Sequence, residues 1–163
     1  MKAKLPEIFV SCAAWFALSV SAASADQHLQ PASDSFPVAQ AELRERVMSI
    51  ANDIMSANIE GLQTAHLASA KFTKFGPRKF ERQNLTETNA SEAAFFSSIS
   101  QVDYRIHDLK IDVFGDIGIV TYYPQVSFVK ENESRSVDGR QTLVFLKTDE
   151  GWKIVHEHGT VRP

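Results

Sequence analysis

The hydrophobic positions of the chain follow two different periods, first that of a helix and then that of a strand. Near the start, four apolar residues are spaced by four, three and four positions, which places them on one face of an α-helix. These residues are Leu43, Val47, Ile50 and Ile54. The charged residues of this segment lie largely off that face. The pattern predicts a long amphipathic helix from Val38, whose apolar face must cover another layer of the structure.

Two shorter helices are expected before the period changes. Asn58 and Gly61 interrupt the first helix, and a second helix is expected to end at about Leu67. A third helix is expected over residues 92–99, where an apolar run follows three candidate N-caps. The candidate N-caps are Thr88, Asn89 and Ser91.

From residue 100 onward apolar and polar residues alternate, which is the period of β-strands. The expected strands are 102–106, 109–113, 117–129, 140–147 and 152–160, with turns at 115–116 and 149–151. Pro124 indicates a bulge or a sheet edge, and residues 130–138 are expected to form a polar connection. Helices followed by antiparallel strands predict an α+β fold, with three N-terminal helices packed on one face of a curved antiparallel sheet.

The first 25 residues have the features of a cleavable signal peptide. A basic start precedes an apolar run over residues 8–20, and residues 23–25 form a small-residue cleavage site. The run is too short to span a bilayer comfortably. We therefore expect an exported protein, periplasmic or secreted, that is not held in a membrane after cleavage. Residues 26–37 are expected to be a flexible lead-in to one domain over residues 38–163.

Composition narrows the chemistry that the expected mature domain can perform. Cys12 is the only cysteine and lies in the expected signal peptide. The mature domain would therefore have no disulfide, no thiolate nucleophile and no cysteine metal ligand. The chain has a net charge of −3 and no basic stripe, which argues against nucleic acid as a partner.

Two segments of the strand region resemble a known family. Residues 140–160, RQTLVFLKTDEGWKIVHEHGT, resemble the closing hairpin of SnoaL-like proteins and of the kinase II association domain. In that hairpin a Gly-Trp turn leads into a strand with a His-x-His pair. Residues 108–123, DLKIDVFGDIGIVTYY, resemble the preceding hairpin with its Gly-Asp turn. With the order of the elements, the resemblance to the nuclear-transport-factor-2-like superfamily covers about residues 38–161.

This resemblance implies a cone-shaped fold, in which a bent sheet wraps round the long first helix and leaves a pocket at its open end. It also implies a homodimer formed through the outer face of the sheet. Members of the superfamily include ketosteroid isomerases, polyketide cyclases, dehydratases and non-catalytic assembly domains. The resemblance therefore does not settle the function.

The last expected strand has two alternative orientations. Side chains alternate along a strand, so one face would carry Trp152, Ile154, His156 and His158. The other face would carry Glu157 together with Lys153. Polarity favours burial of the tryptophan and both histidines, with Glu157 in solvent. The likeness to the association domain favours the opposite arrangement, which places Glu157 in the pocket.

The candidate catalytic residues are His156, His158 and Glu157. An imidazole can act as a general acid or base near neutral pH, and Glu157 can act as a base if burial raises its pKa. The alternatives are a hydrogen-bonded histidine pair and an exposed carboxylate. Two histidines on one strand could also chelate a metal, but nothing fixes a third ligand, so we expect no metal site.

Five more residues are candidates for contact with a ligand. Arg140 could clamp an anionic or carbonyl group. Tyr104 and Tyr122 could donate hydrogen bonds to a developing enolate, a role that tyrosines have in the isomerase relatives. His66, at the end of the second helix, could line the mouth of the pocket, and Trp152 shares the histidine face.

Three functions remain open from the sequence. The first is a domain that binds a small, mostly apolar molecule in the cone pocket. The second is an isomerase, cyclase or dehydratase with a His or Glu base. The third is a homodimeric interaction module. We expect no cofactor for any of them, and the expected partners are a small-molecule ligand and a second copy of the chain.

Overall fold

The computed structural model describes residues 35–77 and 79–162. The predicted signal peptide and nearly all of the predicted lead-in lie outside these residues. The elements are α1 (Pro37–Met55), α2 (Ile59–Ala65), β1 (Thr73–Phe75), α3 (Leu85–Ser97), β2 (Ser100–Phe114), β3 (Ile117–Lys130), β4 (Glu133–Thr148) and β5 (Gly151–Val161). Within the described ranges, no helix is both long enough and apolar enough to cross a membrane.

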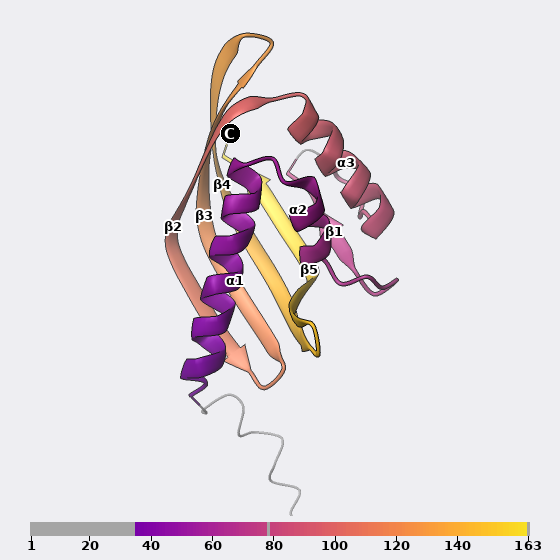
Figure 1. The fold of residues 1–163 in the computed structure, drawn as a ribbon, viewed down its shortest axis with the longest axis vertical. Helices are drawn as coiled ribbons and strands as arrows, with labels where there is room; N and C mark the ends of the chain where they lie inside the picture. Colours follow the sequence, from indigo (N-terminus) through magenta and orange to yellow (C-terminus); the bar gives the residue numbers. More distant parts are fainter. Residues whose placement is uncertain (1–34, 78, 163) are drawn as a thin grey trace, which may run out of the picture.

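The strands form one curved, open sheet in the order β1-β5-β4-β3-β2, and the helices lie on one side of it (Figure 1). We call the side covered by α1 the inner face and the opposite side the outer face. β1 runs parallel to β5, and all the other neighbouring strands are antiparallel. The predicted α+β fold, with helices packed on a curved sheet, is confirmed.

The apolar stripe of α1 forms the centre of the core. Leu43, Val47 and Ile50 are buried against the inner face, as expected for an amphipathic helix that covers a sheet. Gly118 on β3 allows this close approach, because a Cβ atom at that position would lie 2.3 Å from a methyl carbon of Leu43. The first predicted helix is therefore confirmed, and it begins one residue before Val38, at Pro37.

After residue 100 the chain forms four strands, which are longer than the five strands that the alternation predicted. Residues 102–106 and 109–113 belong to one strand, β2, which contains a bulge where Asp108 has a φ of +52°. The polar connection expected at 130–138 is wrong. β3 and β4 continue through it to a tight turn at Glu131 and Asn132, both with positive φ, as in the turns that suit two-residue hairpins. This hairpin projects beyond the rest of the sheet (Figure 1).

The third helix begins earlier than the sequence predicted. Its N-cap is Asn84, whose side-chain oxygen accepts a hydrogen bond from the backbone N–H of Glu87 at 3.0 Å. The Glu87 carboxylate accepts one in return from the Asn84 backbone N–H at 2.9 Å. This reciprocal capping box satisfies two N–H groups that a helix start leaves free. The predicted caps at 88–91 are therefore wrong and lie inside the helix.

A bulge in β5 decides which side chains face inward. Val144 on β4 pairs with His156, but the next residue, Phe145, pairs with Ile154, so Val155 is an extra residue on β5. Such a bulge reverses the alternation beyond it. Trp152 and Ile154 are buried before the bulge, and Glu157 is buried after it. Each of the two predicted orientations is therefore correct for one half of the strand.

Candidate functional site

A cavity of about 430 Å³ lies between the three helices and the inner face of the sheet. Most of its wall is apolar, and its lining comes from α1, α2, α3 and all five strands of the sheet. The apolar residues of the wall include Ile50, Ile54, Leu62, Phe95, Phe96, Val126, Phe128 and Leu143. The size and lining are those of a site for a small organic molecule.

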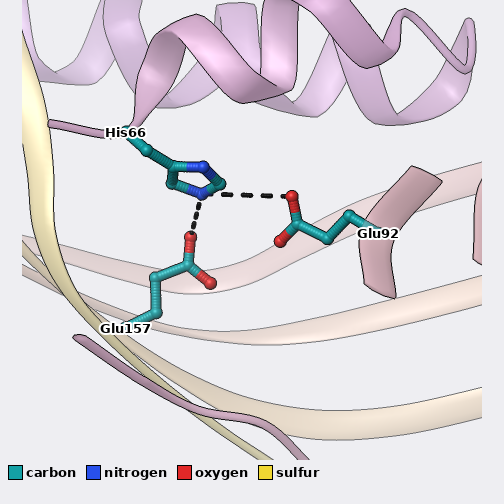
Figure 2. Close-up of side chains that lie close together, drawn as sticks. All are labelled: His66, Glu92 and Glu157. Atoms are coloured by element: carbon teal, nitrogen blue, oxygen red, sulfur yellow. Dashed lines mark hydrogen bonds and ion pairs between the residues drawn. The ribbon is translucent and has the colours of Figure 1, made fainter. Parts of the chain in front are cut away.

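One end of the cavity carries four ionisable side chains, which we call the tetrad: His66, Lys74, Glu92 and Glu157. His66 follows α2, Lys74 lies on β1, Glu92 lies on α3 and Glu157 lies on β5. Figure 2 shows the His66 ring between the two carboxylates. Its Nε2 atom lies 2.9 Å from Glu157 Oε1 and 4.0 Å from Glu92 Oε2. The Lys74 ammonium contacts Glu92 and lies 2.7 Å from Glu157 Oε2.

Neighbouring opposite charges favour the ionised forms of Glu157, Lys74 and His66. Burial alone would raise the pKa of Glu157, but the neighbouring Lys74 and His66 outweigh it and hold that pKa at about 2. Burial opposes a charge on Lys74 as well, yet Glu157 and Glu92 raise the pKa of Lys74 above its ordinary value. Burial similarly disfavours charge on His66, and the bond to Glu157 outweighs it and raises the pKa of His66. Buried charges are tolerated when they are paired in this way.

Asn89 on α3 is the hydrogen-bond partner of the second ring nitrogen of His66. Its side-chain Oδ1 atom lies 3.1 Å from His66 Nδ1. Since the Glu157 carboxylate can only accept at Nε2, a ring that also donates to Asn89 carries two protons. The raised pKa of His66 favours this charged form. The tetrad then contains two positive and two negative charges and is neutral.

A pair of tyrosines lines the cavity on β2 and β3. The hydroxyl oxygens of Tyr104 and Tyr122 lie 3.1 Å apart. Burial raises the pKa of Tyr104 to about 12, and it raises the pKa of Tyr122 well above its ordinary value. Both hydroxyls therefore stay protonated near neutral pH. Their mutual bond uses one of the two protons, and the other is left without an acceptor in the described part of the chain.

The predicted site residues fall into two groups. Glu157, His66, Tyr104 and Tyr122 line the cavity, and the exposed Arg140 borders it. His156, His158 and Trp152 are not among the cavity residues. His156 Nδ1 lies 2.8 Å from the Thr73 hydroxyl, and Trp152 Nε1 donates to Glu42 at 3.2 Å. The expected burial of both histidines is wrong, because the bulge at Val155 turns them to the outer face, where His158 is exposed.

Comparison with known proteins defines the family. Residues 43–162 match the model of the SnoaL-like domain. The chain belongs to this family. Among curated proteins, the search found no match. The predicted resemblance to SnoaL-like proteins is confirmed.

Solved structures share the fold of this SnoaL-like domain at low sequence identity. A proposed dehydratase of the NTF2-like family from Streptomyces avermitilis is 16% identical with a TM-score of 0.71, over 77% of this chain and 97% of that chain. An NTF2-like superfamily protein from Salmonella enterica is 16% identical with a TM-score of 0.70, over 77% and 92%. The CaMKII hub of S. rosetta is 22% identical with a TM-score of 0.62, over 79% and 99%. These similarities support the fold and not an activity.

Three residues of the site in this SnoaL-like domain were not predicted from the sequence. Lys74, Asn89 and Glu92 come from β1 and α3, and they meet His66 and Glu157 only in the folded chain. One signal was available, since Lys74 lies between Phe72 and Phe75 in a segment of alternating polarity. Nothing in the sequence indicated that its partner would be a glutamate more than eighty residues away.

Three side chains of the SnoaL-like domain lie close enough together to be tested as ligands of a metal ion. One atom each from His66, Glu92 and Glu157 lies within 4.8 Å of the others. The Lys74 ammonium, however, already contacts both carboxylates. A metal ion would have to displace this cation and leave its charge buried beside the metal. The residues present therefore fit a metal poorly.

Proposed function

We propose that this SnoaL-like domain binds a small, mostly apolar molecule in the cavity between its helices and its sheet. The observation that carries the proposal is the cavity itself, with about 430 Å³ of space, an apolar wall and a few polar groups gathered together. Pockets of this kind hold organic ligands, which gain affinity from apolar burial and orientation from the polar groups.

The polar groups of the cavity indicate what the buried part of the ligand carries. The tetrad is neutral as a unit, so a second buried charge would lack a counter-ion. The buried part of the ligand is therefore uncharged. The free proton of the Tyr104–Tyr122 pair needs an acceptor when water is displaced, and a carbonyl, ether or alcohol oxygen would provide it.

The same electrostatics favour binding over acid–base catalysis. A general base works best when its pKa lies near the operating pH. The pKa of Glu157 is held at about 2 by Lys74 and His66 against the effect of burial, so Glu157 is a weak base. The raised pKa of Lys74 makes it a poor base as well. An isomerase, cyclase or dehydratase activity would need a base with a pKa near neutral pH, and neither Glu157 nor Lys74 has one in the ion-paired tetrad.

The binding proposal can be tested with a simple apolar alcohol, 4-phenylbutan-1-ol. We expect saturable heat in a calorimetric titration and a concentration-dependent rise in melting temperature. Val126→Phe fills the cavity from β3 and is expected to abolish both signals. Val129→Phe, the same change on the outer face of the same strand, is expected to leave them intact. Lack of binding by the unmodified domain, or equal binding by both variants, would contradict the proposal.

We also propose that two copies associate through the outer face. Phe114, Ile117 and Ile119 are more than a third exposed there at one end of β2 and β3, and contiguous exposed apolar groups are typical of association sites. The structural similarity to a hub domain is consistent with an assembly. Sedimentation at micromolar concentration is expected to give a dimer, and a monomer would contradict this part of the proposal.

We also propose that the domain is exported. The support is the basic start, the apolar run over residues 8–20 and the small residues at 23–25. N-terminal sequencing of the protein from its host is expected to begin at Asp26.

A further inference from the structure

A second hollow, of about 540 Å³, lies on the outer face of the sheet. His107 on β2 pairs with Tyr123 on β3, and the register in which Tyr122 pairs with Gln141 places Tyr123 opposite Arg140 on β4. Tyr122 and Gln141 line the cavity on the inner face. Because successive side chains of a strand point to opposite faces, the side chains of Tyr123 and its two neighbours lie on the outer face. The sheet separates them from the cavity.

Two guanidinium groups border this outer hollow. Arg140 lies on β4, and Arg162 directly follows β5. The backbone N–H of Arg162 donates to the backbone oxygen of Asp138 at 2.7 Å, while Arg140 pairs with Thr160. The two arginines are therefore diagonal neighbours on the sheet, a position in which Cβ atoms lie about 7–8 Å apart. Side chains of this length can close from both sides on one small anionic group.

Neither guanidinium group forms an ion pair within residues 35–77 and 79–162. Arg105, on the same face, pairs at 2.8 Å with Asp103, the acid two positions before it. Asp138 has the same spacing to Arg140, yet its Oδ1 atom accepts a hydrogen bond from Gln125 Nε2 at 3.2 Å on the neighbouring strand. The acid that could neutralise Arg140 is thus held by another group.

The charge and the surface of the hollow indicate the class of ligand that fits it. Two guanidinium groups and the Asp138 carboxylate give it a net charge of +1 when histidine is counted as neutral. A singly charged anion balances this charge, whereas the second charge of a dianion would meet Asp138. Tyr123 is 51% exposed and offers a flat apolar surface beside Arg140. A guanidinium fork matches the planar geometry of a carboxylate.

We propose that the outer hollow binds a small aromatic carboxylate, with the carboxylate between Arg140 and Arg162 and the ring against Tyr123. This is a second site, and its ligand does not enter the cavity between the helices and the sheet. It is also separate from the apolar patch proposed to hold a second copy. Tyr123 lies four residues beyond Ile119 on β3, which is about 13 Å along the strand.

Titration of the mature chain with sodium benzoate, followed by amide NMR shifts, tests this site. Saturable shifts are expected at Tyr123, Arg140 and Arg162, and higher salt is expected to weaken binding because the site is exposed. Arg140→Gln is expected to weaken benzoate binding about 5-fold, the effect of losing one exposed ionic contact.

Arg135→Gln is the matched control, since it removes the same charge from the same strand. Arg135 pairs with Glu133 at 3.3 Å and lies five residues before Arg140, about 16 Å along the strand. This distance exceeds the screening length of about 10 Å at roughly 0.1 M salt. The control is therefore expected to bind benzoate as the native chain does.

Four results would overturn the proposal. Equal weakening by the two variants would show an effect of net charge and not of a site. Tighter binding of sulfate than of benzoate would show that the hollow takes dianions. Displacement of benzoate by 4-phenylbutan-1-ol would place benzoate in the cavity. An absence of saturable shifts at Tyr123, Arg140 and Arg162 would show that the hollow holds no carboxylate.

Discussion

The charges of this domain behave differently in two neighbouring regions. In the tetrad, Glu157 and His66 are almost completely buried, and each has a partner of opposite charge within 3 Å. At the rim of the cavity, Arg140 is exposed and has no ionic partner in the described ranges. The first arrangement uses charge to hold four segments of the chain together, and the second leaves a charge exposed to water.

The difference follows from the cost of removing water from a charge. A buried ion without a partner is strongly unfavourable, so the interior contains ions only as a balanced group. An exposed ion keeps its water and can remain unpaired at little cost. The unpaired arginine is therefore found at the surface, and the balanced charges of the tetrad are found in the interior.

Removal of Lys74 is expected to have the largest effect on stability. Lys74→Met leaves Glu157 and Glu92 close together without their shared cation, and breaking a buried pair in this way costs about 3–5 kcal/mol of unfolding free energy. Denaturant unfolding measures it. Lys110→Met is the matched control, since Lys110 pairs with Asp112 on the surface and is expected to cost at most about 1 kcal/mol. Equal losses in the two variants would show that the tetrad is not a buried network.

Acid is expected to weaken the fold through Glu157. Its pKa is about 2 in the folded chain because Lys74 and His66 outweigh the effect of burial, against an ordinary value of 4.5. A lowered pKa adds stability above pH 4.5, and this contribution is lost as the pH falls toward 2. The unfolding free energy of the native chain is therefore expected to fall more steeply between pH 5 and pH 3 than that of Glu157→Gln. Parallel curves would contradict the assignment.

Arg140 is expected to have the smallest effect on the fold. Arg140→Gln removes an exposed group with no ionic partner among the described residues, so the unfolding free energy is expected to change by no more than about 0.5 kcal/mol. The same denaturant measurement applies. A loss of several kcal/mol would show that Arg140 supports the structure and does not behave as an unpaired surface charge.

The sequence was sufficient for the fold because the fold depends on local periodicity. The helical spacing from Leu43 to Ile54 and the alternation after residue 100 each specify one apolar face. The tip of the hairpin, residues 130–136, was missed because its side chains are polar on both faces. Its strands are held by the backbone ladder, which leaves no hydrophobic signal.

The site was harder to predict for two physical reasons. A single extra residue, Val155, reverses which side chains of β5 face inward beyond it. Neither the size nor the polarity of a valine indicates a bulge in the sequence. The tetrad also joins residues from α3, β1, β5 and the end of α2, so no spacing within the sequence connects them. Glu157 and His66 could be chosen as candidates from their chemistry, whereas Lys74 and Glu92 required the folded chain.

The proposed binding function is tested most directly by a crystal structure of the mature protein purified from its host. We expect continuous density for a small molecule in the cavity, with apolar atoms against Phe95 and Phe128 and an oxygen near the Tyr104–Tyr122 pair. A cavity closed by its own side chains, or filled with ordered water alone at saturating 4-phenylbutan-1-ol, would contradict the proposed function.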